Sequence, residues 1–95
     1  MALRTKRFDA AEFLKTPEEI AAYLEEAFSD GDPAYIAAAL GDAARAHGMT
    51  KLANETGLSR ESLYRALSKD GNPELATVLK VMEALGLRLR AVEQS

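Results

Sequence analysis

The sequence contains no cysteine and only one histidine among its 95 residues. The lack of cysteine excludes disulfides and thiol chemistry, and it allows a reducing compartment. His47 alone cannot complete a metal site or a nucleophile pair, and Gly41 and Gly48 do not form a phosphate-binding loop. We therefore expect a protein that is not an enzyme and that uses neither a metal nor a cofactor, with His47 packed or partly exposed at a helix end.

Long apolar runs are also missing. No stretch approaches the length of a membrane span, and the basic segment 1–8 is not followed by the apolar core of a signal peptide. Apolar residues make up 47% of the chain and charged residues 28%, a balance typical of soluble globular proteins. We expect a cytoplasmic protein with a mobile segment at 1–8 and a single helical domain at 9–95.

An excess of positive charge is also missing: 15 Asp and Glu outnumber 12 Lys and Arg, and the net charge is −3. This argues against a general nucleic-acid binder, which is normally basic. The distribution weakens the objection: residues 1–31 carry four Lys/Arg against seven Asp/Glu, whereas residues 49–70 carry four against three. Phosphate neutralisation alone should give a modest, salt-sensitive affinity.

Helix starts are marked by capping residues followed by proline. Thr16-Pro17-Glu18-Glu19 has the composition of a capping box, and Asp32-Pro33 repeats the cap and proline. Asn72-Pro73-Glu74 is expected to open a further helix. Apolar residues at helical spacing predict the buried stripes Ile20/Leu24/Ala27/Phe28, Ile36/Leu40/Ala43/His47 and Leu75/Val78/Leu79/Met82/Leu85.

The stretch from Met49 to Ser68 predicts a helix-turn-helix at 50–68. Gly57 suits the left-handed residue that ends the first helix, and Ser59 suits the cap of the second. Leu52, Leu58, Leu63 and Leu67 supply the apolar anchors. The outer face of the second helix is polar and suits the major groove of DNA, although an ordinary helix hairpin with a solvated face gives the same pattern.

The segment 87–92 changes period, because apolar and charged residues alternate in Leu-Arg-Leu-Arg-Ala-Val. This alternation predicts a short strand. A strand needs a partner for its backbone groups, so we expect it to pair with a second copy or with another protein. The expected dimer contacts are Leu87, Leu89 and Ala91. The alternative is a tail that packs Leu87 and Leu89 on the core.

The run Gly57–Ser68, continued by Asp70–Pro73 and Thr77–Leu87, resembles the addiction-module antidote proteins. Phe8-Asp9 and the acidic helix at 17–28 extend the resemblance to residues 6–92. These proteins are antitoxins of type II toxin–antitoxin pairs, with a helix-turn-helix similar to that of the phage lambda repressor and Cro group. The resemblance implies an all-α, five-helix, lambda-repressor-like DNA-binding domain. It also implies autoregulation of the operon and a small basic toxin of the RelE/ParE type as partner.

Side chains of the second helix are the expected readers of an operator. Arg60 and Arg65 can each donate two hydrogen bonds to guanine, and Tyr64 suits a thymine methyl group or a phosphate. Glu61 suits cytosine, or it pairs with Arg65 on the helix surface. Contacts to the DNA backbone are expected around them. The complete expected interface is Thr50, Lys51, Ser59, Arg60, Glu61, Ser62, Tyr64, Arg65, Ser68 and Lys69.

A basic toxin would be attracted to the acidic N-terminal third, so Glu18, Glu25 and Glu26 are the expected toxin contacts, unless they form only a solvated face. We expect a homodimer that binds double-stranded operator DNA and a cognate toxin. The alternative function is a phage-type or operon repressor without a toxin partner.

Overall fold

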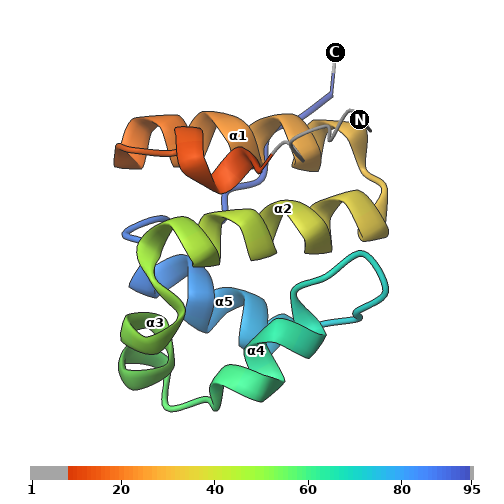
Figure 1. Cartoon of the computed structure of the whole chain (residues 1–95). Coiled ribbons are helices and arrows are strands. Elements are labelled where there is room, and N and C mark those ends of the chain that lie inside the picture. The colour runs from red at the N-terminus through yellow and green to blue at the C-terminus, as the bar shows by residue number, and fades with distance from the viewer. Residues whose placement is uncertain (1–8, 95) are drawn as a thin grey trace, which may run out of the picture.

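The computed structural model describes residues 9–94; the segment 1–8, for which mobility was expected, and residue 95 lie outside this part. Five α-helices follow a short 3-10 turn, and no strand occurs between residues 9 and 94 (Figure 1). The prediction of an all-α, five-helix architecture is confirmed. The elements are η1 (Ala10–Phe13), α1 (Pro17–Asp30), α2 (Pro33–His47), α3 (Met49–Thr56), α4 (Arg60–Ala66) and α5 (Leu75–Ala84).

The predicted caps begin three of these helices. Glu19 donates its backbone N–H to Thr16 Oγ1 at 3.1 Å, and Thr16 donates its own to Glu19 Oε1 at 3.0 Å, which completes the capping box of α1. Asp32 accepts from the backbone of Ala34 at the start of α2. Ser59 caps α4 in the same manner. Each cap satisfies amides that have no partner within the helix.

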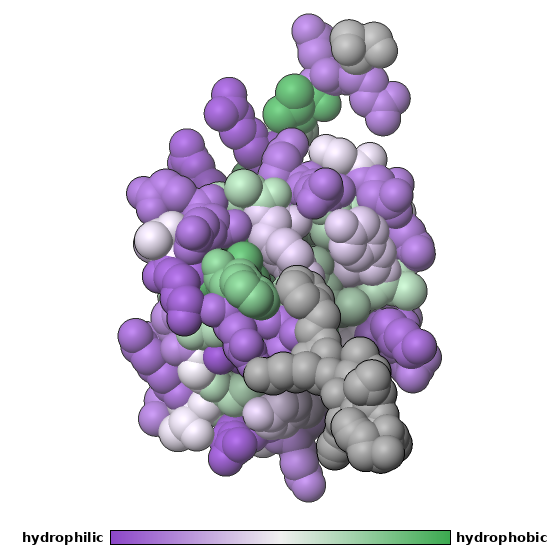
Figure 2. All heavy atoms as spheres, turned by 45° about the horizontal axis from the view of Figure 1, so that its top comes forward, coloured by the Kyte–Doolittle hydropathy of each residue, from purple (hydrophilic) through white to green (hydrophobic). Residues whose placement is uncertain are grey.

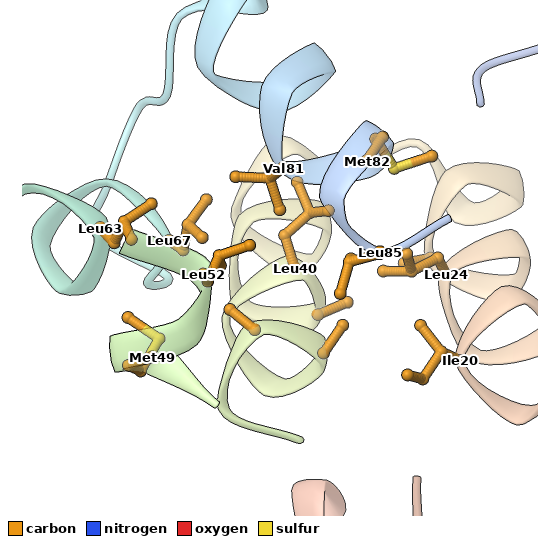
Figure 3. Packing of buried hydrophobic residues seen from close by; sticks show 14 residues of the cluster. Ile20, Leu24, Leu40, Met49, Leu52, Leu63, Leu67, Val81, Met82 and Leu85 are labelled. Carbon is orange, nitrogen blue, oxygen red and sulfur yellow. The ribbon is translucent and has the colours of Figure 1, made fainter. Parts of the chain in front are cut away.

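Helix α2 separates the two sides of the fold: α1 packs along one side, and α3 and α4 pack on the other, with α5 against α3 (Figure 1). All of them except η1 send side chains into one apolar cluster, of which Leu24, Leu40, Leu52, Leu63 and Val81 are the largest fully buried members (Figure 3). Of the predicted anchors, Leu58 is only half-buried. The helix-turn-helix is therefore fixed to α2 on the side away from α1.

None of the helices described is long and apolar enough to cross a bilayer.

Helix α5 differs from its predicted form in two ways. It begins at Leu75 with Glu74 as a cap that makes no side-chain hydrogen bond, so Asn72-Pro73 precedes the helix instead of opening it. Leu75 and Leu79, which were expected in the buried stripe, are 66% and 46% exposed. Val81 is buried instead, beside Met82 and Leu85. The face of α5 that meets the core cluster therefore runs through Val81, Met82 and Leu85, and Leu75 and Leu79 lie outside it.

Residues 87–94 form no regular secondary structure in the single chain. Leu87 donates its backbone N–H to Met82 O at 2.9 Å and packs, half-buried, against the core, whereas Leu89 is 42% exposed. The tail thus combines one anchored leucine with an extended, solvent-facing segment. A paired strand at 87–92 needs a second chain, so it stays a prediction.

Candidate nucleic-acid interface

Helices α3 and α4 form the predicted helix-turn-helix. Gly57 ends α3 with a φ of +77°, a left-handed conformation that glycine adopts at little cost. Two residues later, Ser59 Oγ accepts from the backbone N–H of Ser62 at 3.0 Å and donates to Ser62 Oγ at 2.9 Å. Leu63 is fully buried, and it fixes the inner face of α4 on the core. The outer face is thereby held in solvent.

The exposed side chains of this region include most of those predicted to contact DNA. Arg60, Glu61, Tyr64 and Arg65 are exposed on α4, and Ser62 is half-buried. Exposed residues around α4 and at the start of α3 are Thr50, Lys51, Ser59 and Lys69, while Ser68 is half-buried and donates its hydroxyl to the backbone of Arg65. This exposure agrees with an interface, but the DNA contacts themselves stay predictions.

Two arginines and a tyrosine dominate the surface of α4. The Arg60 guanidinium lies 5.8 Å from the centroid of the Tyr64 ring, which is within the range of a cation–π contact. The alternative pairing of Glu61 with Arg65 is not formed; neither takes part in an ion pair within the described chain. Arg65 is therefore available to an external acceptor.

The N-terminus of α3 is a second anion-accepting feature. Its cap is Gly48, which makes no side-chain hydrogen bond, so the amides of the first turn are not satisfied by a cap. Thr50 and Lys51 are exposed in this first turn. Free amides, the helix dipole and a lysine together favour a phosphate group.

Gly41 lets α2 approach the end of α4 closely, a role that the sequence did not reveal. A Cβ atom built on Gly41 would lie 2.1 Å from the carbonyl oxygen of Leu67, the residue that ends α4. Helix α2 can approach the end of α4 this closely only because residue 41 has no side chain. The close approach fixes how far α4 stands from the body of the protein.

Comparison with known proteins gives the family. The model of the family described as "Probable addiction module antidote protein" matches residues 4–93. The chain belongs to this family. It is also 50% identical over 95 residues to an uncharacterized protein of Haemophilus influenzae (strain ATCC 51907 / DSM 11121 / KW20 / Rd), covering all of this chain and 97% of that protein. No solved structure matches.

In this antidote-family chain, an acidic face lies on the side away from α4. Glu18, Glu25 and Glu26 are exposed on α1 at helical spacing, and none of them is in an ion pair within residues 9–94. The surface that carries α1 is largely hydrophilic (Figure 2). Beside Glu25, a groove of about 670 Å³ runs between α1 and the tail, with Leu24, Phe28 and Leu89 in its lining. These features give the chain a second surface, separate from the helix-turn-helix.

A polar network holds α1 on α2. Tyr23 donates to Asp42 Oδ2 at 2.5 Å, and Arg45 donates to Asp42 Oδ1 at 2.9 Å and to Asp9 Oδ1 at 2.6 Å. The pKa of Tyr23 is raised by burial and by its bond to Asp42, and the pKa of Asp9 is lowered chiefly by its bond to Arg45. Burial by itself would lower the pKa of Arg45, but the two carboxylates raise it.

His47 has a structural partner. It is half-buried at the end of α2, as expected, and its Nε2 lies 2.7 Å from Glu55 Oε1 on α3. The pair ties the first helix of the motif to α2. Sequence reasoning missed this contact and the bonds that join Asp42 to Tyr23 and Arg45 to Asp9, because these partners lie on different elements and share no periodic pattern.

Proposed function

We propose that this chain is an antitoxin that binds operator DNA as a homodimer, represses its own operon and neutralises a small RelE/ParE-like toxin by direct contact. The antidote family supports the antitoxin role and implies a toxin partner. The observation that carries the DNA-binding part is the exposed face of α4, on which Arg60 and Arg65 have no acidic partner. Because these arginines form no ion pair within the described chain, none has to be broken when this face enters the major groove of DNA.

The proposed contacts to DNA divide by position. Arg60 and Arg65 read guanines, Tyr64 contacts a thymine methyl group or a phosphate, and Glu61 discriminates at a neighbouring base pair. Phosphate contacts come from residues at the ends of the motif helices: Thr50, Lys51, Ser59, Ser62, Ser68 and Lys69. Two such motifs related by a two-fold axis would read half-sites about 34–36 Å apart.

The proposed toxin contacts are Glu18, Glu25 and Glu26 on α1. A small basic toxin is attracted by this exposed acidic face, and the neighbouring groove offers apolar contacts. Because α1 and α4 lie on different sides of α2, the two partners would occupy separate surfaces (Figure 1). In the proposed dimer, the tails of the two copies pair through Leu87, Leu89 and Ala91. We also propose that the protein acts in the cytoplasm and is not an enzyme.

The test combines the two functions. The chain is co-expressed with the gene next to its own, and growth is compared with expression of that neighbour alone. The purified protein is then tested in a shift assay on DNA upstream of the operon and on a random duplex of equal length. We expect restored growth, co-purification of the neighbour's product and preference for the upstream DNA.

Two results would change the proposal. Preference for the upstream DNA without any capture or neutralisation of a neighbouring product would leave a repressor without a toxin partner. Equal binding to both duplexes would remove the sequence-specific repressor role.

A further inference from the structure

The connection from α4 to α5 begins with a tight turn, Ser68–Gly71. Gly71 donates its backbone N–H to Ser68 O at 2.8 Å, which closes the turn. Lys69 and Asp70 form its tip; both are exposed, and neither is in an ion pair within residues 9–94. The connection lies on the same side of α2 as α4 (Figure 1). The turn therefore presents one cation and one anion next to the reading helix.

Gly71 packs directly on the end of α4. A Cβ atom built on Gly71 would lie 2.5 Å from Arg65 O and still closer to Ala66 O, so a side chain at this position would displace the turn or the end of the helix. Gly71 does not have a positive φ, so the position requires glycine for space alone. Ser68 adds a second tie, because its hydroxyl donates to Arg65 O at 3.2 Å. The turn thus has a fixed position relative to the last residues of α4.

We propose that Gly71 is a positioning residue for DNA binding: by packing on α4, it holds the tip of the Ser68–Gly71 turn at a phosphate of the duplex when α4 enters the major groove. The proposal rests on the proposed function, in which α4 is the reading helix. At that phosphate Lys69 attracts and Asp70 repels. Both act on every sequence alike, so Asp70 limits the affinity for random DNA and leaves discrimination to α4.

A fixed turn suits this role better than a loose one. Phosphate contacts set the orientation of a protein on the duplex, and a contact can do so only if its own position is fixed. A turn that is already held on α4 also loses less conformational entropy on binding than a flexible loop does. Gly71 therefore acts on DNA through Lys69, without touching DNA itself.

The main test is Gly71→Ala in shift titrations on the operator and on a random duplex. We expect about fivefold weaker binding to both, and a slope of log affinity against log salt that is smaller by about 1, as for the loss of one phosphate contact. In a Lys69→Ala background, Gly71→Ala should change the affinity less than about twofold, because both substitutions remove the same contact.

Gly31→Ala is the control for a general loss of stability. Gly31 ends α1 with a φ of +82° and has open space around it, so alanine strains the backbone there, away from α4. It should lower the Tm and leave the salt slope unchanged, with binding measured where circular dichroism shows all variants folded. An unchanged salt slope in folded Gly71→Ala would overturn the proposal. A loss of preference for the operator would also overturn it, because Gly71 would then hold α4 itself.

Asp70→Asn tests the same placement without disturbing any packing, since Asp70 is exposed. We expect it to strengthen binding to both duplexes about fivefold, because an anion beside a phosphate is removed. Glu12→Gln removes the same charge at an exposed position of η1 and should change the affinity less than about twofold. Equal effects of Asp70→Asn and Glu12→Gln would place the tip away from DNA and overturn the proposal.

The two proposals fail in different ways. If the operator is preferred but Gly71→Ala and Asp70→Asn leave the salt slope unchanged, the positioning role fails and the repressor function stands. If neither duplex is preferred but both variants change binding to random DNA as expected, the positioning role stands and the sequence-specific repressor function fails.

Discussion

The guanidinium group of Arg60 lies 5.8 Å from the centroid of the Tyr64 ring, one helical turn further along α4. The contact holds the arginine without giving it a hydrogen-bond acceptor, so its donors stay available. An arginine held in this way loses less side-chain entropy when it binds a base.

We expect Arg60→Ala to cost about 1–3 kcal/mol at the specific operator and much less on random DNA, because a bidentate guanine contact is lost. Lys69→Ala is the matched control: a phosphate contact is common to all sequences, so both affinities should fall alike. Shift titrations of the two variants on both duplexes measure the difference. Equal losses on both duplexes for Arg60→Ala would exclude its role in base reading.

We expect Gly41→Ala to destabilise the fold although alanine is the better helix former. By helix propensity alone, replacing glycine with alanine inside a helix stabilises the helix by about 1 kcal/mol. Against this, the new methyl group would lie 2.1 Å from Leu67 O, and overpacking of this kind costs about 1–3 kcal/mol. Denaturant unfolding measures the net loss, and Gly41→Val should be worse because its side chain is larger. A more stable Gly41→Ala protein would show that α2 and α4 do not approach so closely.

The ion pair between Asp9 and Arg45 predicts a pH dependence. Arg45 lowers the pKa of Asp9 below its ordinary value of 3.8, so the ionised carboxylate stabilises the folded state. This stabilisation is present above pH 3.8 and is lost as the pH falls through the lowered pKa. We expect Asp9→Asn to lower the Tm at pH 7 and to have a smaller effect at a pH below the lowered pKa.

A double-mutant cycle isolates the pair. In an Arg45→Gln background, Asp9→Asn should change the Tm little at either pH, because the interaction is already absent. If the effect of Asp9→Asn on the Tm depends neither on pH nor on Arg45, it comes from the other hydrogen bond of Asp9, which accepts from the backbone N–H of Ala11, and not from the ion pair.

Charge reversal of Glu25 and Glu26 tests the proposed toxin surface. We expect Glu25→Lys/Glu26→Lys to slow association with the toxin at low salt, because electrostatic attraction acts mainly on the association rate. Operator affinity should not fall, since α1 lies across α2 from α4 (Figure 1). Stopped-flow or surface-binding kinetics at two salt concentrations give the rates. An unchanged association rate at low salt would remove the toxin contacts from this face.

The local signals in the sequence were enough to predict the starts of α1 and α2 and the helix-turn-helix. Thr16, Asp32 and Ser59 act as caps and Gly57 as a left-handed turn, each through atoms a few residues away. The exposed face of α4 followed from the position of its cap. The buried residues of α5 did not follow completely: the predicted stripe included Leu75 and Leu79, which are exposed, and left out Val81, which is buried.

The sequence by itself determined where α1, α2 and α4 begin, where α3 ends and which face of α4 carries charge, because capping and periodicity act within one or two helical turns. Tertiary structure decided the rest. The approach of Gly41 to Leu67, the bond from Tyr23 to Asp42 and the exposure of Leu75 and Leu79 depend on how helices distant in the chain share a filled core. Packing at constant density lets only one of several similar apolar side chains occupy a given space, and no local pattern records which one.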